Sequence, residues 1–177
     1  HHAAETMASF LLEGFLQEAM SDSAAGKAFR EKHVLFAVPL VDTDGVEEGD
    51  QGKNRRPHDH NRDYGEKSIY PEVQAIRKLD EKYDFRFALD FHCPTLVMKD
   101  HQVMYFVGAK EHPPWNFDNV SQFATQIKQR LPKSAPYGPL VWLKKESKPA
   151  PMKSRYFGFK KHAIRAATLE FPFAPPG

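Results

Sequence analysis

The stretch FRFALDFH, residues 85–92, decides the fold class. Its odd-numbered positions are all large and apolar, whereas its even-numbered positions are smaller or polar and end in Asp90 and His92. Alternation with a period of two residues is typical of a β-strand with one apolar and one polar face. The segment is therefore predicted to be a strand that carries chemically useful side chains at its carboxyl end.

Helical and extended patterns alternate on both sides of this strand. Residues 34–41 form a continuous apolar run, which predicts a strand buried on both faces of a parallel sheet. Alternating strands and helices predict an α/β domain with a mixed, largely parallel sheet flanked by helices. Helices are predicted over residues 6–20, 71–82 and 120–131, and further strands over residues 103–107, 140–143 and 163–171.

The candidate functional residues follow from this arrangement. Sites in such sheets collect at the carboxyl ends of the strands, where Asp42, His92 and Glu170 are predicted to lie. The polar segment 42–64 is long for a connection, and long connections in compact domains are usually functional. We therefore expect one shared site.

Composition narrows the classes of function. The chain has 177 residues with a net charge of +2, which fits one globular domain and gives no reason to expect a nucleic acid or an anionic membrane as a partner. It has no apolar run long enough for a membrane helix. Its single cysteine, Cys93, excludes an internal disulfide but does not fix the compartment, so that localisation stays open between secreted, periplasmic and cytoplasmic.

A histidine and a carboxylate stand three residues apart at the start of the chain. At a helix mouth or tight turn, the spacing of His2 and Glu5 allows both side chains to reach one cation. Such pairs are usually ordinary surface residues, and a single strand-end histidine such as His92 is more often structural. His1 and His2 also fit a purification-tag remnant, although the motif that follows favours a native segment.

Five segments, in order, resemble motifs of the zinc carboxypeptidase family. His2-Ala3-Ala4-Glu5 is similar to the HxxE motif of that family. The segment from Pro39 through Asp42-Thr43-Asp44-Gly45-Val46 is similar to its NPDG loop, and Asp59-His60-Asn61-Arg62-Asp63-Tyr64 is similar to DLNRDF. Asp90-Phe91-His92 and Thr168-Leu169-Glu170-Phe171 complete the set. The ordered set spans nearly the whole chain and implies a carboxypeptidase-like fold.

The resemblance implies a role for each matching residue. His2, Glu5 and His92 would be the ligands of one Zn²⁺, with a fourth position left for water. Glu170 would be the general base that takes the proton of this water. The apolar surroundings of Glu170 argue against the alternative of a solvated surface carboxylate.

The segment around the Asn-Arg pair would bind substrate. Asn61 and Arg62 would hold the terminal carboxylate of a peptide or an amino-acid-derived substrate, although a simple turn with a surface arginine is the alternative. Asp59 would accept a hydrogen bond from His2 and so fix the tautomer of its ring. His60 takes a position that is usually apolar in the family, and we interpret it and His58 as solvated loop histidines.

The sequence departs from the family at the carbonyl-polarising arginine. Arg55, Arg56 or Lys53 would serve, with Arg55 favoured. Tyr156 is the nearest candidate for the mobile tyrosine of the family. Arg155 occupies the position that sets specificity, where a cation suits an acidic C-terminal residue, unless this loop is simply basic and solvated.

Together these features predict a zinc-dependent exopeptidase that cleaves the C-terminal amide bond of peptides. The alternatives are a zinc amidohydrolase that deacylates N-acyl amino acids, as in aspartoacylase-like relatives, and an inactive peptide-binding relative. Two strands and a helix usually precede HxxE in the family, and their absence predicts that residues 1–177 are an incomplete catalytic domain or associate with something that completes it.

Overall fold

The computed structural model describes residues 1–94, 103–109, 114–133, 135, 137, 138, 141–143, 153–158, 160 and 165–173. The helices are α1 (Met7–Met20), α2 (Ala24–Lys32), α3 (Thr43–Glu48), the 3₁₀ turn η1 (His60–Arg62), α4 (Pro71–Tyr83), α5 (Pro114–Arg130) and α6 (Lys153–Gly158). The strands are β1 (Phe87–His92), β2 (Tyr105–Ala109), β3 (Val141–Leu143) and β4 (Arg165–Glu170). Helices and strands are both present as predicted, but they do not alternate regularly, because α1 to α4 all precede the first described strand.

The described strands form one mixed sheet in the order β1-β4-β2-β3. The pairs β1–β4 and β2–β3 are parallel, whereas β2 and β4 are antiparallel. The fold class predicted from the sequence is thereby confirmed. In the β1–β4 register, Phe87 pairs with Arg165 and His92 pairs with Glu170, so that both strands end at the same level.

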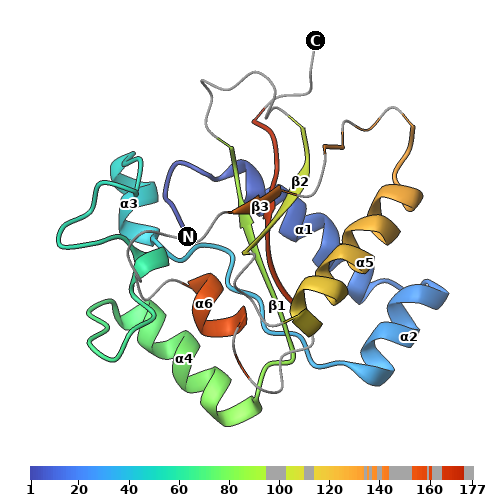
Figure 1. The fold of residues 1–177 in the computed structure, drawn as a ribbon, viewed down its shortest axis with the longest axis horizontal. Helices are drawn as coiled ribbons and strands as arrows, with labels where there is room; N and C mark the ends of the chain where they lie inside the picture. Colours follow the sequence, from blue (N-terminus) through green and yellow to red (C-terminus); the bar gives the residue numbers. More distant parts are fainter. Residues whose placement is uncertain are drawn as a thin grey trace.

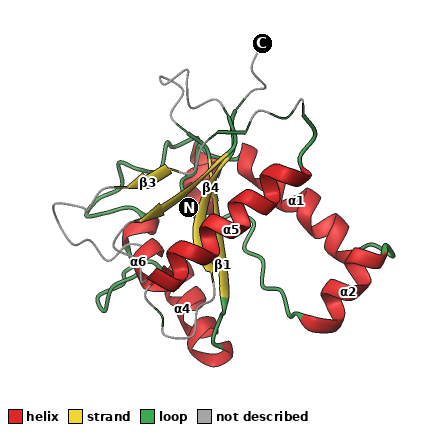
Figure 2. Ribbon diagram, turned by 45° about the vertical axis from the view of Figure 1, so that its right-hand side comes forward, coloured by secondary structure: helices red, strands yellow, loops and turns green. Residues whose placement is uncertain are grey.

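Helices cover both faces of the sheet (Figures 1 and 2). One apolar cluster joins Phe106, Ala167 and Leu169 of the sheet to Val120 of α5, with Leu11 of α1 packed against it. On the other face, Ala166 of β4 packs with Val73 of α4 and other residues of a second cluster. Neighbouring residues of β4 therefore point into opposite cores, as the period of two requires.

The strand at residues 85–92 and the helices at residues 6–20 and 71–82 lie close to their predicted bounds, whereas the helix predicted at residues 120–131 begins six residues earlier, at Pro114. Pro71 starts α4, where its missing N–H costs no helical hydrogen bond. The sequence did not reveal α2, which has few apolar residues. Its N-cap is Ser23, whose hydroxyl accepts a hydrogen bond from the backbone N–H of Gly26 at 2.9 Å.

The strand predicted at residues 34–41 is wrong. This segment is extended but belongs to no strand of the described sheet, and residues 34–40 are exposed. Its contacts are with side chains beside the edge of the sheet: the ring of Phe36 lies 4.8 Å from that of Tyr83 and 5.0 Å from that of Phe85. A continuous apolar run indicates a tendency to be buried, but it does not supply the neighbouring strand that a buried strand needs.

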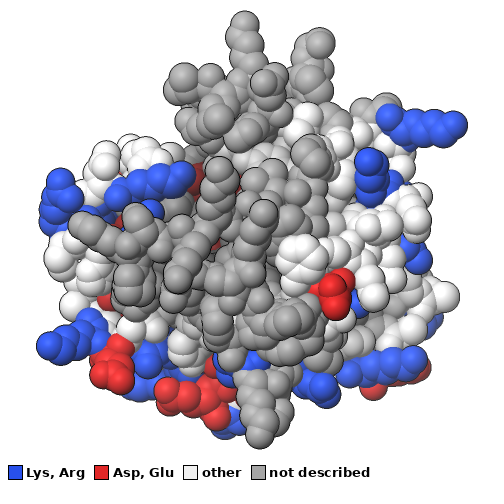
Figure 3. All heavy atoms as spheres, viewed as in Figure 1, with Lys and Arg blue, Asp and Glu red and all other residues white. Residues whose placement is uncertain are grey.

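Charges of both signs are mixed on the surface. Figure 3 shows Lys and Arg side chains next to Asp and Glu side chains along the lower rim of the molecule. Among the described residues, no helix combines the length and the apolar character needed to cross a membrane.

Candidate metal centre

The centre forms where the start of the chain meets the end of β1. His2 and Glu5 lie in the turn that leads into α1, in which the backbone N–H of Glu5 donates to the carbonyl of His2 at 3.1 Å. His92 is the last residue of β1, and the backbone N–H of Phe171 donates to its carbonyl at 2.7 Å. The two segments are nearly 90 residues apart in the sequence, and side-chain contacts join them: Sγ of Cys93 donates to the carbonyl of Glu5 at 3.6 Å.

His2, Glu5 and His92 are all buried and offer ligand atoms that lie within 4.8 Å of one another. Nδ1 of His2 lies 3.1 Å from Oε1 of Glu5, and Nδ1 of His92 lies 2.6 Å from Oε2 of the same carboxylate. Two imidazoles and one carboxylate are a known donor set for catalytic zinc. The residues fit a zinc ion by the chemistry and spacing of their donor atoms.

The outer nitrogens of both histidines face carboxylates. Nε2 of His92 lies 2.5 Å from Oδ2 of Asp90, and Nε2 of His2 lies 3.9 Å from Oδ1 of Asp59. Metal-binding histidines usually turn their second nitrogen to such a partner, which fixes the ring and its tautomer. Asp90 meets this pattern with a short hydrogen bond, whereas the distance from Asp59 to His2 is longer than a hydrogen bond.

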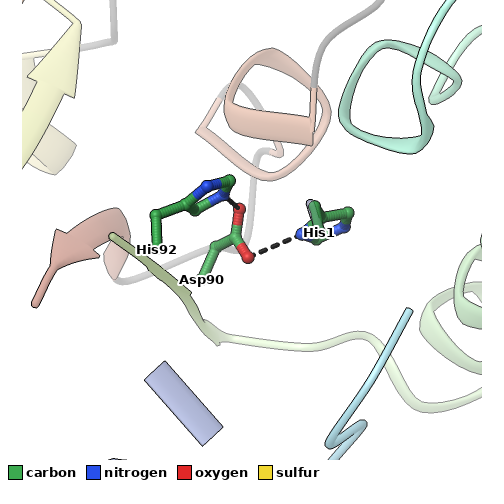
Figure 4. A group of neighbouring side chains, drawn as sticks. All are labelled: His1, Asp90 and His92. Carbon is green, nitrogen blue, oxygen red and sulfur yellow. Dashed lines mark hydrogen bonds and ion pairs between the residues drawn. The ribbon is translucent and has the colours of Figure 1, made fainter. Parts of the chain in front are cut away.

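His1 also enters the centre, and sequence reasoning missed it. Its Nδ1 lies 2.6 Å from Oδ1 of Asp90, and its Nε2 lies 2.7 Å from the hydroxyl of Tyr64. Figure 4 shows Asp90 between His1 and His92. His1, Asp90 and His92 also satisfy the spacing for a metal. The better donor set is that of His2, Glu5 and His92, because all three are buried, whereas His1 is only partly buried.

Burial and charge shift the pKa values of the cluster in opposite directions. Burial alone would raise the pKa of Glu5, but hydrogen bonds from His2 and His92 hold it well below its usual range. Burial alone would lower the pKa of His92, but the charge and hydrogen bond of Asp90 and the hydrogen bond of Glu5 raise it. Glu5 is therefore ionised at neutral pH and carries the negative charge that a divalent cation needs.

Glu170 lies beside the cluster at the end of β4. It is half-buried, and its Oε2 has no hydrogen-bond partner among the described residues. Burial raises the pKa of Glu170, the charge of His92 opposes this, and the charges of Glu5 and Asp90 add to it, with Lys53 opposing. An unpaired carboxylate oxygen beside a donor set for zinc is able to accept the proton of a nearby water.

The loop between α3 and η1 runs against the centre. Lys53 extends its ammonium to 3.1 Å from Oε1 of Glu5. Arg55 is held by Asp42, with its Nε 3.1 Å from Oδ2 and its Nη2 2.8 Å from Oδ1, and its Nη2 also lies 3.3 Å from Oδ2 of Asp50. Asp42 is the N-cap of α3 and not the end of a strand. The catalytic role of Arg55 stays a prediction.

The Asn-Arg pair lies in η1. Asn61 is buried, and its Oδ1 has no hydrogen-bond partner within the described part of the chain. Arg62 forms an ion pair with Asp59, while its side chain keeps 44% of its surface exposed. A pocket of about 360 Å³ opens beside Arg62 and is lined by His58, Asp63, Gly65, Glu66 and Lys67 as well. The proposed substrate contacts of Asn61 and Arg62 stay predictions.

Three further residues were singled out from the sequence: His60, Tyr156 and Arg155. His60 is buried, not solvated, because its ring stacks on Tyr70 with the centroids 3.8 Å apart. Tyr156 lies on α6 with its ring 5.6 Å from that of Tyr64, and burial raises its pKa to about 12. Arg155 belongs to α6, but its side chain lies outside the described residues.

The fold is that of a metallocarboxypeptidase-like α/β protein. No family model matches the chain. Residues of the chain are 28% identical over 118 residues to cytosolic carboxypeptidase 2 of Xenopus tropicalis, a match that covers 63% of this chain and 12% of that protein. They are 32% identical over 97 residues to cytosolic carboxypeptidase 3 of Bos taurus, covering 51% of this chain and 10% of that protein.

Solved structures of metallo-carboxypeptidases have a similar fold. A metallo-carboxypeptidase from Burkholderia cenocepacia superposes with a TM-score of 0.78 at 19% identity, over 97% of this chain and 46% of that one. A metallo-carboxypeptidase from Pseudomonas aeruginosa in complex with (2-guanidinoethylmercapto)succinic acid gives a TM-score of 0.71 at 18% identity, with the same coverage. These comparisons confirm the resemblance to the zinc carboxypeptidase family, and the chain spans less than half the length of either structure.

Proposed function

We propose that the chain carries the catalytic centre of a zinc-dependent carboxypeptidase, which hydrolyses the C-terminal amide bond of a peptide. The observation that supports it best is the meeting of three buried ligand side chains, His2, Glu5 and His92, within 4.8 Å. The relatives named above are carboxypeptidases, which agrees with this chemistry. A bound zinc ion would supply a polarised water of lowered pKa.

The residues of the chain supply the proton transfers. Glu170 takes one proton from water while the water oxygen forms a bond to the carbonyl carbon and the carbonyl π pair moves onto its oxygen. The carbon–nitrogen bond then breaks, the oxygen re-forms its double bond, and the leaving nitrogen takes the proton from Glu170. The half-buried position and free Oε2 of Glu170 suit both transfers.

Substrate orientation falls to the η1 segment. Arg62 keeps a partly exposed guanidinium beside a pocket, and a guanidinium binds a carboxylate through two parallel hydrogen bonds. Asn61 adds an amide next to it. We propose that this pair binds the terminal carboxylate, while Asp59 holds Arg62 in place and faces His2. The Pseudomonas aeruginosa structure is a complex with a succinic acid derivative, which is consistent with carboxylate recognition in this fold.

The preference for the last residue of the peptide is proposed from the sequence. Arg155 would favour an acidic C-terminal side chain, and Tyr156 would contact the substrate from the same helix, α6. If so, Arg155→Ala lowers kcat/KM for a peptide ending in Glu more than for one ending in Leu. Equal losses for both peptides would exclude this assignment.

The test of the function begins with metal content. The purified chain is expected to hold about one zinc per molecule by mass spectrometry, His92→Ala to lose it, and His33→Ala, which changes an exposed histidine of the α2 C-terminus, to keep it. The zinc-loaded chain is then offered a peptide with a free C-terminus, the same peptide with a C-terminal amide, and an N-acyl amino acid.

The proposal requires cleavage of the free peptide and much slower cleavage of the amide, because Arg62 needs a carboxylate. Faster hydrolysis of the N-acyl amino acid would favour an amidohydrolase. Zinc binding without hydrolysis of any of the three would favour a binding protein. Either result would overturn the proposal.

A further inference from the structure

We infer that Lys53, rather than Arg55, is the cation that stabilises the oxyanion formed on the scissile carbonyl. The inference rests on the proposed peptidase function. When water adds to a carbonyl, negative charge develops on the carbonyl oxygen, and a fixed hydrogen-bond donor of positive charge lowers the barrier. The question is which cation of this chain reaches the place where that charge develops.

Lys53 reaches the centre directly. Its Nζ lies 3.1 Å from Oε1 of Glu5, and its positive charge opposes the rise in the pKa of Glu170 that burial causes. Of all lysines and arginines in the described residues, Lys53 is the one that forms an ion pair with a proposed ligand or with the proposed base. The ammonium therefore lies at the proposed ligand Glu5.

The backbone before Lys53 fixes this approach. Gly52 has a φ of +95°, and a Cβ atom there would lie 2.6 Å from the backbone nitrogen of Ala3 and 3.1 Å from Cα of His2. The backbone N–H of Ala4 donates to the carbonyl of Gln51 at 3.4 Å. Glycine is required at this position because the loop lies directly on the backbone of the ligand turn. The backbone of Lys53 consequently lies at the edge of the metal centre.

Lys53 is also accessible from outside. Its side chain keeps 45% of its surface exposed, whereas that of Glu5 keeps 4%. The side chain of Lys53 thus reaches from the buried ligand Glu5 to the solvent, from which a peptide would bind. An ammonium carries three N–H donors, so that one hydrogen bond to Glu5 leaves others for a carbonyl oxygen. The step is a hydrogen bond to the oxyanion, and Lys53 keeps its protons.

Arg55 is bound to carboxylates outside the proposed ligand set. Its guanidinium makes two hydrogen bonds with Asp42 and an ion pair with Asp50. A Cβ atom on Gly45 would lie 2.5 Å from Nη2 of Arg55, so the guanidinium is packed tightly against the start of α3. These contacts give Arg55 a part in holding the loop and the N-terminus of α3 together.

The test compares Lys53→Met, Lys53→Arg and Arg55→Met with Lys27→Met, which removes an exposed charge on α2 that pairs with Asp22. Lys53→Met is expected to lower kcat on a C-terminal peptide about 10²- to 10³-fold with little change in KM, the range found when one oxyanion donor is removed. Lys53→Arg should recover a large part of this loss. Arg55→Met should reduce thermal stability more than kcat.

Two further measurements do not depend on turnover. Zinc affinity, measured by competition with a chelator, should be equal or tighter in Lys53→Met, because a positive charge beside Glu5 opposes a second cation. A phosphinic dipeptide, which imitates the tetrahedral oxyanion, should bind Lys53→Met at least about tenfold more weakly, about 1.4 kcal/mol. Binding of the free C-terminal amino acid should not change.

Each outcome decides the matter. If wild type hydrolyses the peptide while Lys53→Met keeps its kcat and its phosphinic affinity, Lys53 is not the oxyanion donor and the peptidase function stands. If Lys53→Met loses zinc together with stability, the lysine serves only to hold Glu5. If zinc-loaded wild type hydrolyses no peptide, the proposed function fails, and equal phosphinic binding by wild type and Lys53→Met would then overturn the inference as well.

Discussion

Two ends of the molecule reverse the usual relation between residue type and burial. At the metal centre, ionisable side chains are buried: His2 is 8% exposed, Glu5 6% and His92 4%. At the edge of the sheet near residues 34–40, apolar side chains are exposed, with Val34 at 83% and Phe87 of β1 at 46%. Residue type alone would have placed both groups wrongly.

The difference lies in the partners. At the centre, both histidines contact the Glu5 carboxylate and His92 also contacts Asp90, so that these hydrogen bonds offset the cost of burying the carboxylates. At the edge of the described sheet, β1 pairs on one side only, with β4. A run of apolar residues there has aromatic contacts but no strand of the described sheet beside it. Partners, more than polarity, decide what is buried.

The largest effect tests Oε2 of Glu170, which has no hydrogen-bond partner among the described residues. We expect Glu170→Gln to lower kcat about 10²- to 10⁴-fold, because an amide cannot accept the proton of water. Zinc content should stay at the wild-type level, since the ligand set does not include Glu170. Steady-state kinetics and metal analysis check both, with Glu31→Gln on α2 as the control. Loss of zinc in Glu170→Gln would identify Glu170 as a ligand instead.

The same reasoning explains what the sequence could predict. The alternation in residues 85–92 depends on the local pleat alone, and it placed Asp90 and His92 correctly on one face of β1. The approach of His2 to His92 depends on distant segments, and only the ordered set of motifs suggested it. The run at residues 34–41 was misjudged because a strand requires a neighbour that the run itself does not encode.

Other features were hidden for similar reasons. His1 seemed uninformative beside His2, yet it reaches Asp90 and Tyr64 across 89 and 63 residues of sequence. His60 seemed a loop residue, but stacking on Tyr70 buries it. The requirement for glycine at Gly52 follows from the approach of the ligand turn, which no local pattern records. Pairings between distant side chains are the part of the site that a single sequence does not contain.

A smaller effect tests how far the outer carboxylate supports the buried end. We expect Asp90→Asn to weaken zinc binding about 10- to 100-fold, because the amide no longer fixes the tautomer and basicity of His92. Competition with a chelator measures the affinity. Asp84→Asn, at an exposed position after α4, is the matched control. If both variants bind zinc like wild type, the 2.5 Å contact of Asp90 with His92 has no influence on the donor set.

A pair of valines compares a buried apolar side chain with an exposed one. Val73 is 0% exposed, whereas Val34 is 83% exposed. Replacing valine by threonine keeps the shape and adds a hydroxyl, so Val73→Thr should cost about 1–3 kcal/mol of unfolding free energy. Val34→Thr should stay within about 0.5 kcal/mol of wild type. Urea unfolding monitored by circular dichroism checks both values, and equal costs would mean that the edge is covered in solution.

The smallest effect concerns the pH dependence of stability at His60, a buried ionisable residue outside the ligand set. Burial lowers the pKa of His60 below its ordinary value of 6.5; the charges of Asp42 and Glu72 oppose this shift, Arg55 adds to it and Asp63 opposes it. As pH falls below 6.5, the unfolded chain therefore takes up this proton first, and the folded state loses stability until pH passes the folded pKa.

His60→Phe keeps a ring against Tyr70 and removes this titration. We expect the difference in unfolding free energy between wild type and His60→Phe to change with pH below 6.5, by at most about 1.4 kcal/mol per pH unit, with wild type losing more stability toward acid. His33→Gln, at an exposed histidine, should follow wild type. Parallel pH profiles for wild type and His60→Phe would show that His60 binds its proton equally well in the folded and unfolded chains, so that burial does not lower its pKa.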